Sequence, residues 1–360
     1  MDNKIEKVEE IVSALENKET TLYFFTIDTK NAPNGEVKYV YDIAYNLHQL
    51  GYKVVMLHQE EEFVGPFEWL GERYEVLEHK DVKDENVVVS ASDFLFIPEV
   101  YSNVMGQTKT FPCRRIMIYY NPSYFIDYMP VGATLADLNI NDVITTNDTL
   151  AKQLGEYFPN INVKVIRPSV RDFFSTSEEP KKLVVNLLTP TASEVNDIIK
   201  PFYWKYPFYK WVSFRDLKGI QQASLADTMR DGAISVWVDD NTTNGLTALE
   251  ALKSGSLLVA KVPKTVPEWM KDGEELRKDI IWVDSYDMLH NVLSSLVRAW
   301  TKDEIFSDYF TVHEKVKDIF TETVQVNDIK KVFEDDIYYS TISTFKQVLG
   351  NMKNNETKAE

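Results

Sequence analysis

The stretch Ser235–Pro267, SVWVDDNTTNGLTALEALKSGSLLVAKVPKTVP, carries most of the fold information in this chain of 360 residues. It opens with an apolar strand at 236–238, which runs into turn-forming residues that end at Gly245. Leucines then recur at helical spacing until Gly255, and a second apolar strand follows at 257–262. The order strand, loop, helix and strand predicts one βαβ unit of a parallel sheet.

The loop of this unit is rich in Gly, Thr and Asn and lies between the carboxyl end of a strand and the start of a helix. Such loops bind anionic ligands, because the free N–H groups of the first helical turn and the positive end of the helix dipole point there. Glu250 follows about one turn into the helix, where its carboxylate is placed to accept hydrogen bonds from a ribose diol. This arrangement predicts a nucleotide-sugar site. The alternative is an ordinary strand, turn and helix in which Glu250 is solvated.

The same stretch resembles the donor-binding block of glycosyltransferases of the GT-B fold, in particular the large retaining group called family 4. Those enzymes carry the pattern E-G-F-G-[LT]-x-x-[LP]-E-A-[ML]-[AK]-[SC]-G-x-P-V-[VI]-[AG]. The match consists of Gly245, Leu246, residues 249–255 and residues 259–260. The resemblance implies that Glu250 binds the ribose of the donor. The first glutamate of the pattern, which contacts the donor sugar, falls on Thr242, and the phenylalanine falls on Asn244.

Similar enzymes also hold the donor diphosphate with an Arg and a Lys after the first strand of the second domain, but 186–191, NLLTPT, carries neither. We expect Arg215 and Lys218 to replace them, since a guanidinium is a planar fork for phosphate oxygens. The alternative is a surface cluster of Arg215 with Asp216. The resemblance places the nucleobase near main-chain groups of 220–221. The predicted donor-binding residues are therefore Thr243, Asn244, Gly245, Leu246, Thr247, Glu250, Arg215 and Lys218.

The first half of the chain shows a second βαβ unit, with strands at 22–27 and 53–57 and a helix at 37–50. Its segment NGEVKYVYDIAYNLHQLGYKVVML resembles the opening of many GT-B enzymes, although Glu36 stands where a second glycine is usual. The resemblance implies that this first loop faces the cleft and touches the acceptor or a donor phosphate. The alternative is a sharp turn without a ligand. We expect three residues near the cleft: Asn34, Gly35 and Lys38.

Further strands are predicted at 86–90, 93–97, 115–119, 143–145 and 164–166. Each of them ends in a polar, turn-forming group. In open α/β sheets the carboxyl ends of the strands line the ligand crevice. On this ground three more residues become candidates for the acceptor side of the cleft: Glu99, Asn121 and Asn147.

Length and composition suit two α/β domains, since 44% of the residues are hydrophobic. The predicted fold class is therefore α/β with two Rossmann-like parallel-sheet domains that face a cleft, the GT-B architecture that the resemblance implies. The predicted parts are an N-terminal helix at 1–20, an acceptor domain at 21–174, a nucleotide-sugar domain at 175–305, C-terminal helices at 306–350 that return to the first domain, and a disordered tail at 351–360.

Charge and cysteine content exclude several classes of protein. The net charge of −17 opposes nonspecific binding to nucleic acid or to an anionic membrane, although it does not exclude a local basic cleft. Cys113 is the single cysteine and the five histidines form no ligand pair, so neither a disulfide framework nor a metal site is expected. No apolar run is long enough to span a bilayer, and the N-terminus lacks the features of a signal peptide. We expect a cytoplasmic protein.

These features predict a glycosyltransferase that moves a sugar from a nucleoside-diphosphate-sugar to an unidentified acceptor. The resemblance implies retention of configuration, no metal and no cofactor beyond the donor as co-substrate. It implies a glycan, lipid-linked, protein or modified-base acceptor. Two alternatives stay open. One is a catalytically inactive GT-B homologue that binds a nucleotide or a partner protein, which Thr242 and the missing cations favour. The other is a related two-domain enzyme such as a sugar-nucleotide 2-epimerase.

Overall fold

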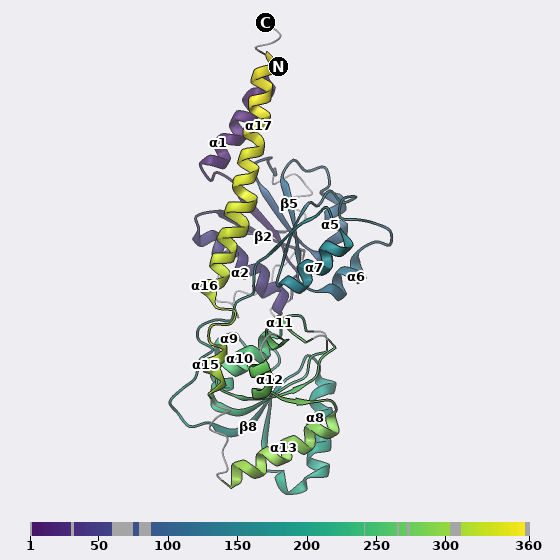
Figure 1. Cartoon of the computed structure of the whole chain (residues 1–360), viewed down its shortest axis with the longest axis vertical. Coiled ribbons are helices and arrows are strands. Elements are labelled where there is room, and N and C mark those ends of the chain that lie inside the picture. The colour runs from purple at the N-terminus through teal and green to yellow at the C-terminus, as the bar shows by residue number, and fades with distance from the viewer. Residues whose placement is uncertain are drawn as a thin grey trace. The chain divides into compact units, whose positions relative to one another are not determined.

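The chain forms two compact units, Met1–Pro168 with Thr323–Glu360 and Ser169–Glu322 (Figure 1). The computed structural model describes residues 2–29, 32–59, 75–78, 88–240, 242–264, 266–271, 274–302 and 311–356.

The first unit contains a parallel sheet of seven strands. Its strands are β1 (Thr21–Phe25), β2 (Lys53–His58), β3 (Glu75–Glu78), β4 (Phe94–Pro98), β5 (Arg114–Tyr119), β6 (Asp142–Thr145) and β7 (Asn162–Val165). They pair in the order β3-β2-β1-β4-β5-β6-β7. The strand order therefore reverses between β1 and β4. The carboxyl ends of the strands at such a reversal are the usual ligand position in open α/β sheets.

Helices cover both faces of this sheet, because alternate strand residues point to opposite faces and both sets are apolar. Phe24 and Phe96 stack on one face, with ring centroids 4.1 Å apart, and Phe25 and Leu95 belong to the core on the other face. The helical elements of this unit are α1 (Asp2–Glu16), α2 (Gly35–Gln49), η1 (Glu99–Tyr101), α5 (Ser102–Gln107), α6 (Pro122–Tyr128), α7 (Asp148–Tyr157), α16 (Glu322–Ile329), the π-helical segment η3 (Lys330–Tyr338) and α17 (Tyr339–Glu356).

The last of these helices, α17, runs antiparallel to α1 and packs beside it (Figure 1). Ion pairs join Lys346 to Glu16 and Lys353 to Glu9, each at 2.5 Å. The prediction of a disordered tail from Asn351 is therefore wrong as far as Glu356, because packing against α1 extends the helix. Residues 357–360 lie outside the described part of the chain.

The second unit contains a parallel sheet of five strands, which are β8 (Lys182–Leu188), β9 (Ser213–Asp216), β10 (Gly232–Trp237), β11 (Leu257–Lys261) and β12 (Ile281–Val283). Their order is β12-β11-β10-β8-β9, so the reversal lies between β8 and β10. The helical elements are α8 (Ala192–Lys205), η2 (Pro207–Tyr209), α9 (Gln222–Asp231), α10 (Leu246–Lys253), α11 (Glu268–Lys271), α12 (Glu274–Asp279), α13 (Tyr286–Thr301) and α15 (Val312–Val316). Helices α8 and α13 pack on one face, and α9 and α10 on the other.

Further details differ from the sequence-based expectations. Among the C-terminal helices expected at 306–350 to return to the first domain, α15 instead belongs to the second unit, because Val312 and Val316 are buried in its core. The units divide after Pro168 and not near 175, because Val170 and Phe174 are buried in the core of the second unit. The strand expected at 86–90 is wrong for Val88–Ser90, which are irregular, while 86 and 87 lie outside the described residues.

Candidate functional site

The loop that leaves β10 in the second unit ends at Gly245, which is held in the left-handed backbone region with φ 61°. A Cβ at this position would lie 2.9 Å from Cγ of Pro267 and 3.4 Å from the terminal methyl carbon of Met270. Only glycine meets both conditions without strain. The loop therefore closes tightly onto the segment after β11, at the point where the strand order reverses.

Three further contacts hold this loop in place. Thr242 accepts a hydrogen bond on Oγ1 from the N–H of Gly245, at 3.0 Å. Nε1 of the buried Trp269 donates to the carbonyl oxygen of Asn244, at 2.7 Å. Lys261 pairs with Asp240 at 3.0 Å. Sequence reasoning missed Trp269 and Lys261, because they reach the loop only through the pairing of β10 with β11.

The start of α10 has no side-chain cap. Gly245 provides no capping side chain, so the first N–H groups of the helix, at Leu246 and Thr247, have no side-chain cap. Leu246 is half-buried and Thr247 is exposed, as is expected at the rim of a site, and Thr243 is half-buried beside them. Free N–H groups at a helix start favour an anion, and a phosphate group satisfies this requirement.

Glu250 lies in the buried part of α10 and is only 5% exposed. It belongs to a charged group around Lys253, one turn further along the helix. Burial lowers the pKa of Lys253, while Asp172, Asp318, Glu250 and Glu322 raise it. This burial excludes the alternative in which Glu250 is a solvated helix residue.

The structure does not bring Arg215 to the Gly245 loop. Its guanidinium donates two hydrogen bonds to Oδ2 of Asp231, at 3.0 and 3.1 Å, and Lys182 reaches the same carboxylate at 2.7 Å. Asp231 directly precedes β10, so this cluster lies at the opposite edge of the sheet from Gly245. The expectation that Arg215 binds phosphate is corrected, because its ion pair with Asp231 holds the guanidinium away from the Gly245 loop. The alternative of a surface cluster with Asp216 is not found either, since the partner of Arg215 is Asp231.

Lys218, in contrast, lies at the end of the sheet where the strands have their carboxyl ends. Its Nζ donates to the carbonyl oxygen of Pro190 at 2.7 Å, in the turn that follows β8. Thr191 in this turn forms a capping box with Glu194 at the start of α8. Lys218 therefore lies beside the turn between β8 and α8, and its expected role as a phosphate-binding cation stays a prediction. Gln221, the residue before α9, is exposed.

Replacing Gly245 by Ala is expected to destabilise the second unit by about 1–2 kcal/mol from backbone strain, and further because Pro267 must move. Gly219→Ala is the matched control, since Gly219 also has positive φ, at 75°, but a Cβ there would meet nothing within 4 Å. Urea unfolding should show a larger loss for Gly245→Ala than for Gly219→Ala. Equal losses would mean that the contact with Pro267 does not constrain the loop.

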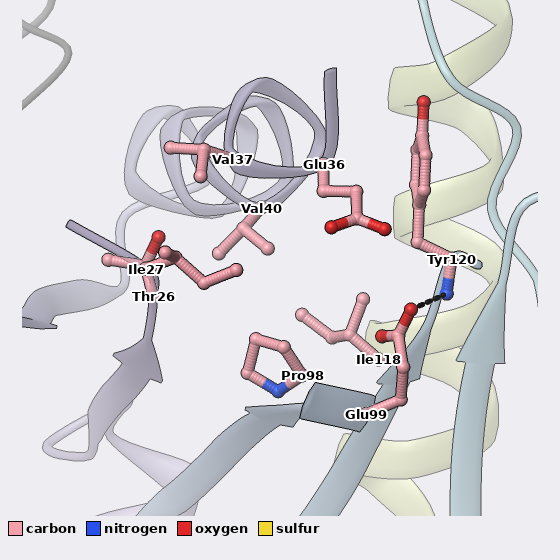
Figure 2. Close-up of a pocket in the computed structure, with 9 residues that line it drawn as sticks. All are labelled: Thr26, Ile27, Glu36, Val37, Val40, Pro98, Glu99, Ile118 and Tyr120. Carbon is pink, nitrogen blue, oxygen red and sulfur yellow. Dashed lines mark hydrogen bonds between the residues drawn. The ribbon is translucent and has the colours of Figure 1, made fainter. Parts of the chain in front are cut away.

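In the first unit, a small pocket lies at the carboxyl ends of β1, β4 and β5, beside the start of α2 (Figure 2). It encloses about 10 Å³ accessible to the centre of a water molecule, room for about one water. The carboxyl groups of Glu36, on α2, and Glu99, on η1, point toward the same space in Figure 2. The lining residues are Thr26, Ile27, Glu36, Val37, Val40, Pro98, Glu99, Ile118 and Tyr120.

Both glutamates have a pKa raised above the ordinary value of a carboxyl group. Burial raises the pKa of Glu99 to about 7, against the hydrogen bonds that its Oε1 accepts from the N–H groups of Tyr120 and Asn121, at 3.2 and 2.7 Å. Burial and the charge of Glu99 raise the pKa of Glu36 to about 9. Within the described chain, Oε1 of Glu36 is buried without a hydrogen-bond partner. At neutral pH Glu36 is therefore protonated and can donate a hydrogen bond, while Glu99 is close to its pKa and accepts one in its ionised form.

The three predicted asparagines of this unit all cap helices, and their side-chain oxygens are engaged. Oδ1 of Asn34 accepts from the N–H groups of Glu36 and Val37, at 2.9 and 3.1 Å. The remaining two are Asn121, which accepts from Ser123 at 3.0 Å, and Asn147, which accepts from Leu150 at 2.9 Å. Asn34 and Asn121 therefore position the elements beside the pocket, and Asn147 performs the same task at α7.

Lys38 does not line the pocket. It is buried and pairs with Asp42, one turn along α2, and its predicted place near the cleft stays a prediction. Gly35 is close to the pocket, because a Cβ there would lie 3.2 Å from the hydroxyl oxygen of Tyr120. The absence of a side chain at Gly35 lets α2 approach Tyr120.

In the described ranges, the His, Cys, Asp and Glu side chains form no group of three or more suited to a metal ion. No described helix has the length and the apolar character needed to cross a bilayer.

No protein-family model matches the chain. Among curated proteins, the chain is similar to an α-1,6-glucosyltransferase of Actinobacillus pleuropneumoniae serotype 7, with 23% identity over 209 residues. The similar part covers 54% of this chain and 63% of that relative, so it spans less than two thirds of the relative's length.

Solved structures resemble nearly the whole chain. The pneumococcal O-GlcNAc transferase GtfA in complex with UDP and GlcNAc has a TM-score of 0.62 at 9% identity, covering 88% of this chain and 99% of that one. Sucrose-phosphate synthase from Thermosynechococcus elongatus has a TM-score of 0.58 at 11% identity, covering 88% and 98%. The lipopolysaccharide outer core galactosyltransferase WaaB has 0.58 at 9%, covering 88% and 100%. The chain therefore has the GT-B fold, and this prediction is confirmed.

Proposed function

We propose that this chain of the GT-B fold is a glycosyltransferase that uses a nucleoside-diphosphate-sugar donor. The observation that carries the proposal is the braced Gly245 loop, which leaves the start of α10 without a side-chain cap and is followed by the buried Glu250. The similar solved structures include one in complex with UDP and GlcNAc, and the similar curated protein is a glucosyltransferase. The UDP bound in that structure and the glucosyltransferase name of that protein support the proposal that this chain binds a sugar donor.

The donor diphosphate would bind at the N–H groups of Leu246 and Thr247, with Lys218 as the nearby cation of the β8 turn. Glu250 would accept hydrogen bonds from the ribose. Preorganised N–H groups and a cation stabilise the departing diphosphate electrostatically, so we propose transfer without a metal ion or another cofactor. Retention of configuration is proposed from the resemblance of the donor-binding block to the retaining family 4 enzymes. The donor stays a co-substrate.

The acceptor side of the proposal rests on the pocket of the first unit. Glu36 in its protonated form donates a hydrogen bond, and the ionised form of Glu99 accepts one. A pocket of about one water in size fits a single hydroxyl group, which needs both a donor and an acceptor. We therefore propose that Glu36 and Glu99 bind a hydroxyl group of a glycan, lipid-linked, protein or modified-base acceptor.

The Glu250→Gln variant tests the donor site while keeping the side-chain volume. We expect nucleotide affinity to fall roughly 10- to 100-fold, because a hydrogen bond to a charged group is worth about 1.5–3 kcal/mol. The measurement is calorimetric titration with UDP, GDP, dTDP and CMP and with their sugars. Glu179→Gln is the control, since Glu179 is exposed. Wild-type protein that binds none of these ligands, or equal affinities in both variants, would contradict the proposed role.

A second candidate is an inactive homologue that binds a nucleotide without transferring a sugar. Two observations favour it: Thr242, at the position of the sugar-contacting glutamate, is used to hold Gly245, and Arg215 is bound to Asp231. The two candidates separate in a donor-turnover assay. Release of free nucleotide from the bound nucleotide-sugar supports the transferase, whereas tight binding without any release supports the inactive homologue.

A further inference from the structure

The pocket of the first unit holds a third polar group besides its two glutamates. Thr26, directly after β1, lines this pocket and is only 1% exposed (Figure 2). Its backbone is fixed, because its N–H donates to the carbonyl oxygen of Leu57 at 3.0 Å and its carbonyl oxygen accepts from the hydroxyl of Tyr101 at 3.1 Å. Its Oγ1, like Oε1 of Glu36, is buried without a hydrogen-bond partner in the described part of the chain. Buried polar groups of native proteins are normally paired, so these two atoms indicate a polar ligand.

Helix α6 is tied to this pocket at both of its ends. At its start, the N–H of Asn121 donates to Oε1 of Glu99 at 2.7 Å. At its end, the carbonyl oxygen of Tyr128 accepts a hydrogen bond from the hydroxyl of Ser102 at 2.6 Å, and Ser102 directly follows η1, which begins at Glu99. Between these two points, Phe125 is buried in the core. The helix is therefore fixed beside Glu99.

Two tyrosines lie on one exposed face of this helix. Tyr124 and Tyr128 are four residues apart within the continuous helix 122–128, so their side chains are neighbours on the same face. They are 38% and 54% exposed. Burial raises the pKa of Tyr124, and the two pocket glutamates and the other tyrosine raise it further, so its phenol group lies within electrostatic range of the pocket. These two residues are called the tyrosine pair below.

The segment that carries the tyrosine pair contains no basic residue. Residues 116–151 include four aspartates and neither Lys nor Arg. A lipid-linked acceptor with phosphate groups, or a base within DNA, would bring negative charge to a segment that has no cation of its own to compensate it. The composition therefore favours an uncharged acceptor.

We propose that the tyrosine pair binds the pyranose ring of a neutral glycan acceptor, while one hydroxyl group of this ring enters the pocket of Thr26, Glu36 and Glu99. A pyranose has hydroxyl groups at its rim and C–H groups on its two faces, so these faces match the apolar faces of aromatic rings. The Thr26 hydroxyl and the phenol hydroxyls can each donate and accept a hydrogen bond. This inference rests on the proposed transferase function, because it names the class of acceptor at the same site.

Other acceptors that carry a hydroxyl group match fewer of these features. A Ser or Thr side chain fills the pocket but has no ring to lie on the tyrosine pair. A hydroxymethylated base has a ring that stacks on aromatic side chains, but it brings the phosphates of DNA with it. A neutral pyranose matches the pocket, the two rings and the local charge together.

The test is saturation-transfer NMR of the full chain, without any nucleotide, with the methyl glycosides of glucose, galactose and N-acetylglucosamine. We expect at least one of these glycosides to bind with a dissociation constant in the millimolar range. Sorbitol has similar hydroxyl groups but no ring faces, so it should not bind. The same measurement with acetyl-serine amide and with 5-hydroxymethyl-2′-deoxycytidine examines the protein and modified-base acceptors.

Variants of the tyrosine pair and of Thr26 separate the rings from the pocket. Tyr124→Ala and Tyr128→Ala should each weaken glycoside binding roughly fivefold, whereas Tyr128→Phe keeps the ring and should bind like wild type. Thr26→Val should weaken binding by a similar factor through the loss of one hydrogen bond. It should not lower the stability to urea, because the Thr26 hydroxyl has no partner to lose in the described chain.

Tyr339→Ala is the matched control for the loss of an exposed ring. Tyr339, at the start of α17, is 50% exposed. The ring of its neighbour Tyr338 lies 5.2 Å from that of Tyr52, which directly precedes β2 at the amino ends of the strands. The pocket is at their carboxyl ends, so glycoside binding of Tyr339→Ala should equal that of wild type.

Four results would overturn the proposal. They are the absence of binding for every glycoside, binding of sorbitol as strong as that of the glycosides, glycoside affinities that Tyr124→Ala and Tyr128→Ala leave unchanged, and binding of the serine or cytidine probe in place of the glycosides. Circular dichroism verifies the folding of each variant. Nucleotide binding by the wild type is measured separately in the calorimetric titration, so failure of this inference is distinguishable from failure of the donor proposal.

Discussion

Replacing Glu36 by Gln is expected to remove a pH dependence from the stability of the first unit. The pKa of Glu36 is raised from 4.5 to about 9 by burial and by the charge of Glu99, so the folded state keeps a proton that the unfolded chain releases. Stability from this proton is complete below the unfolded pKa and is lost as the pH rises through the folded pKa. Even half of this pKa shift would lower the free energy of unfolding by about 3 kcal/mol as the pH rises from the unfolded toward the folded pKa. The uncharged amide of the Glu36→Gln variant carries no such loss.

The measurement compares wild type, Glu36→Gln and the exposed-site control Glu156→Gln by denaturant unfolding across this pH range. The advantage of Glu36→Gln over wild type should grow with pH, while Glu156→Gln should follow wild type. Far-ultraviolet circular dichroism and hydrogen exchange are the appropriate probes, because six of the seven tryptophans belong to the second unit. A constant difference at every pH would show that Glu36 ionises normally, and would remove the proposed hydroxyl-binding pair.

The strands that form the centres of both sheets were predictable because they are buried on both faces and read as apolar runs. The strands expected at 22–27, 93–97 and 115–119 are β1, β4 and β5. The short strand β3 was missed, since its sequence EVLE has two charged residues and little apolar character. The Gly245 loop was predictable too, because positive φ and a helix start leave a local signature in Gly, Thr and Asn.

Side-chain partners far along the chain were not predictable. The position of Arg215 after a strand suggested the ligand edge, but the guanidinium reaches Asp231, and only the packing of the folded sheet brings these two residues together. In the sequence, Glu36 stands where a second glycine is usual, which argued against close approach of a phosphate. Its position as a protonated neighbour of Glu99 depends on the parallel pairing of β1 with β4. Local sequence patterns thus predicted the helices, the strands and the Gly245 loop. The partners of the charged side chains could not be predicted, because they depend on the register with which the strands pair.

Replacing Phe333 by Ala is expected to destabilise the first unit by about 3–5 kcal/mol, the usual cost of removing a buried ring. Phe333 is fully buried in η3, with ring centroids 5.3 Å from Phe94, 5.3 Å from Tyr52 and 5.8 Å from Phe96. These partners lie in β4 and directly before β2, and the whole second unit separates them from Phe333 in sequence. The first unit therefore completes its core only with the last segment of the chain.

Hydrogen exchange measured by mass spectrometry resolves this effect unit by unit. In Phe333→Ala, the amides of β1, β2 and β4 should exchange faster, while those of β8 and β10 should keep their protection. Phe208→Ala is the control, because the Phe208 ring is 87% exposed and should change neither unit. Equal losses in both units would contradict a role confined to the first. Since Glu99 follows β4 directly, loosening of this strand should also lower the raised pKa of the Glu36–Glu99 pair, as water reaches the pocket.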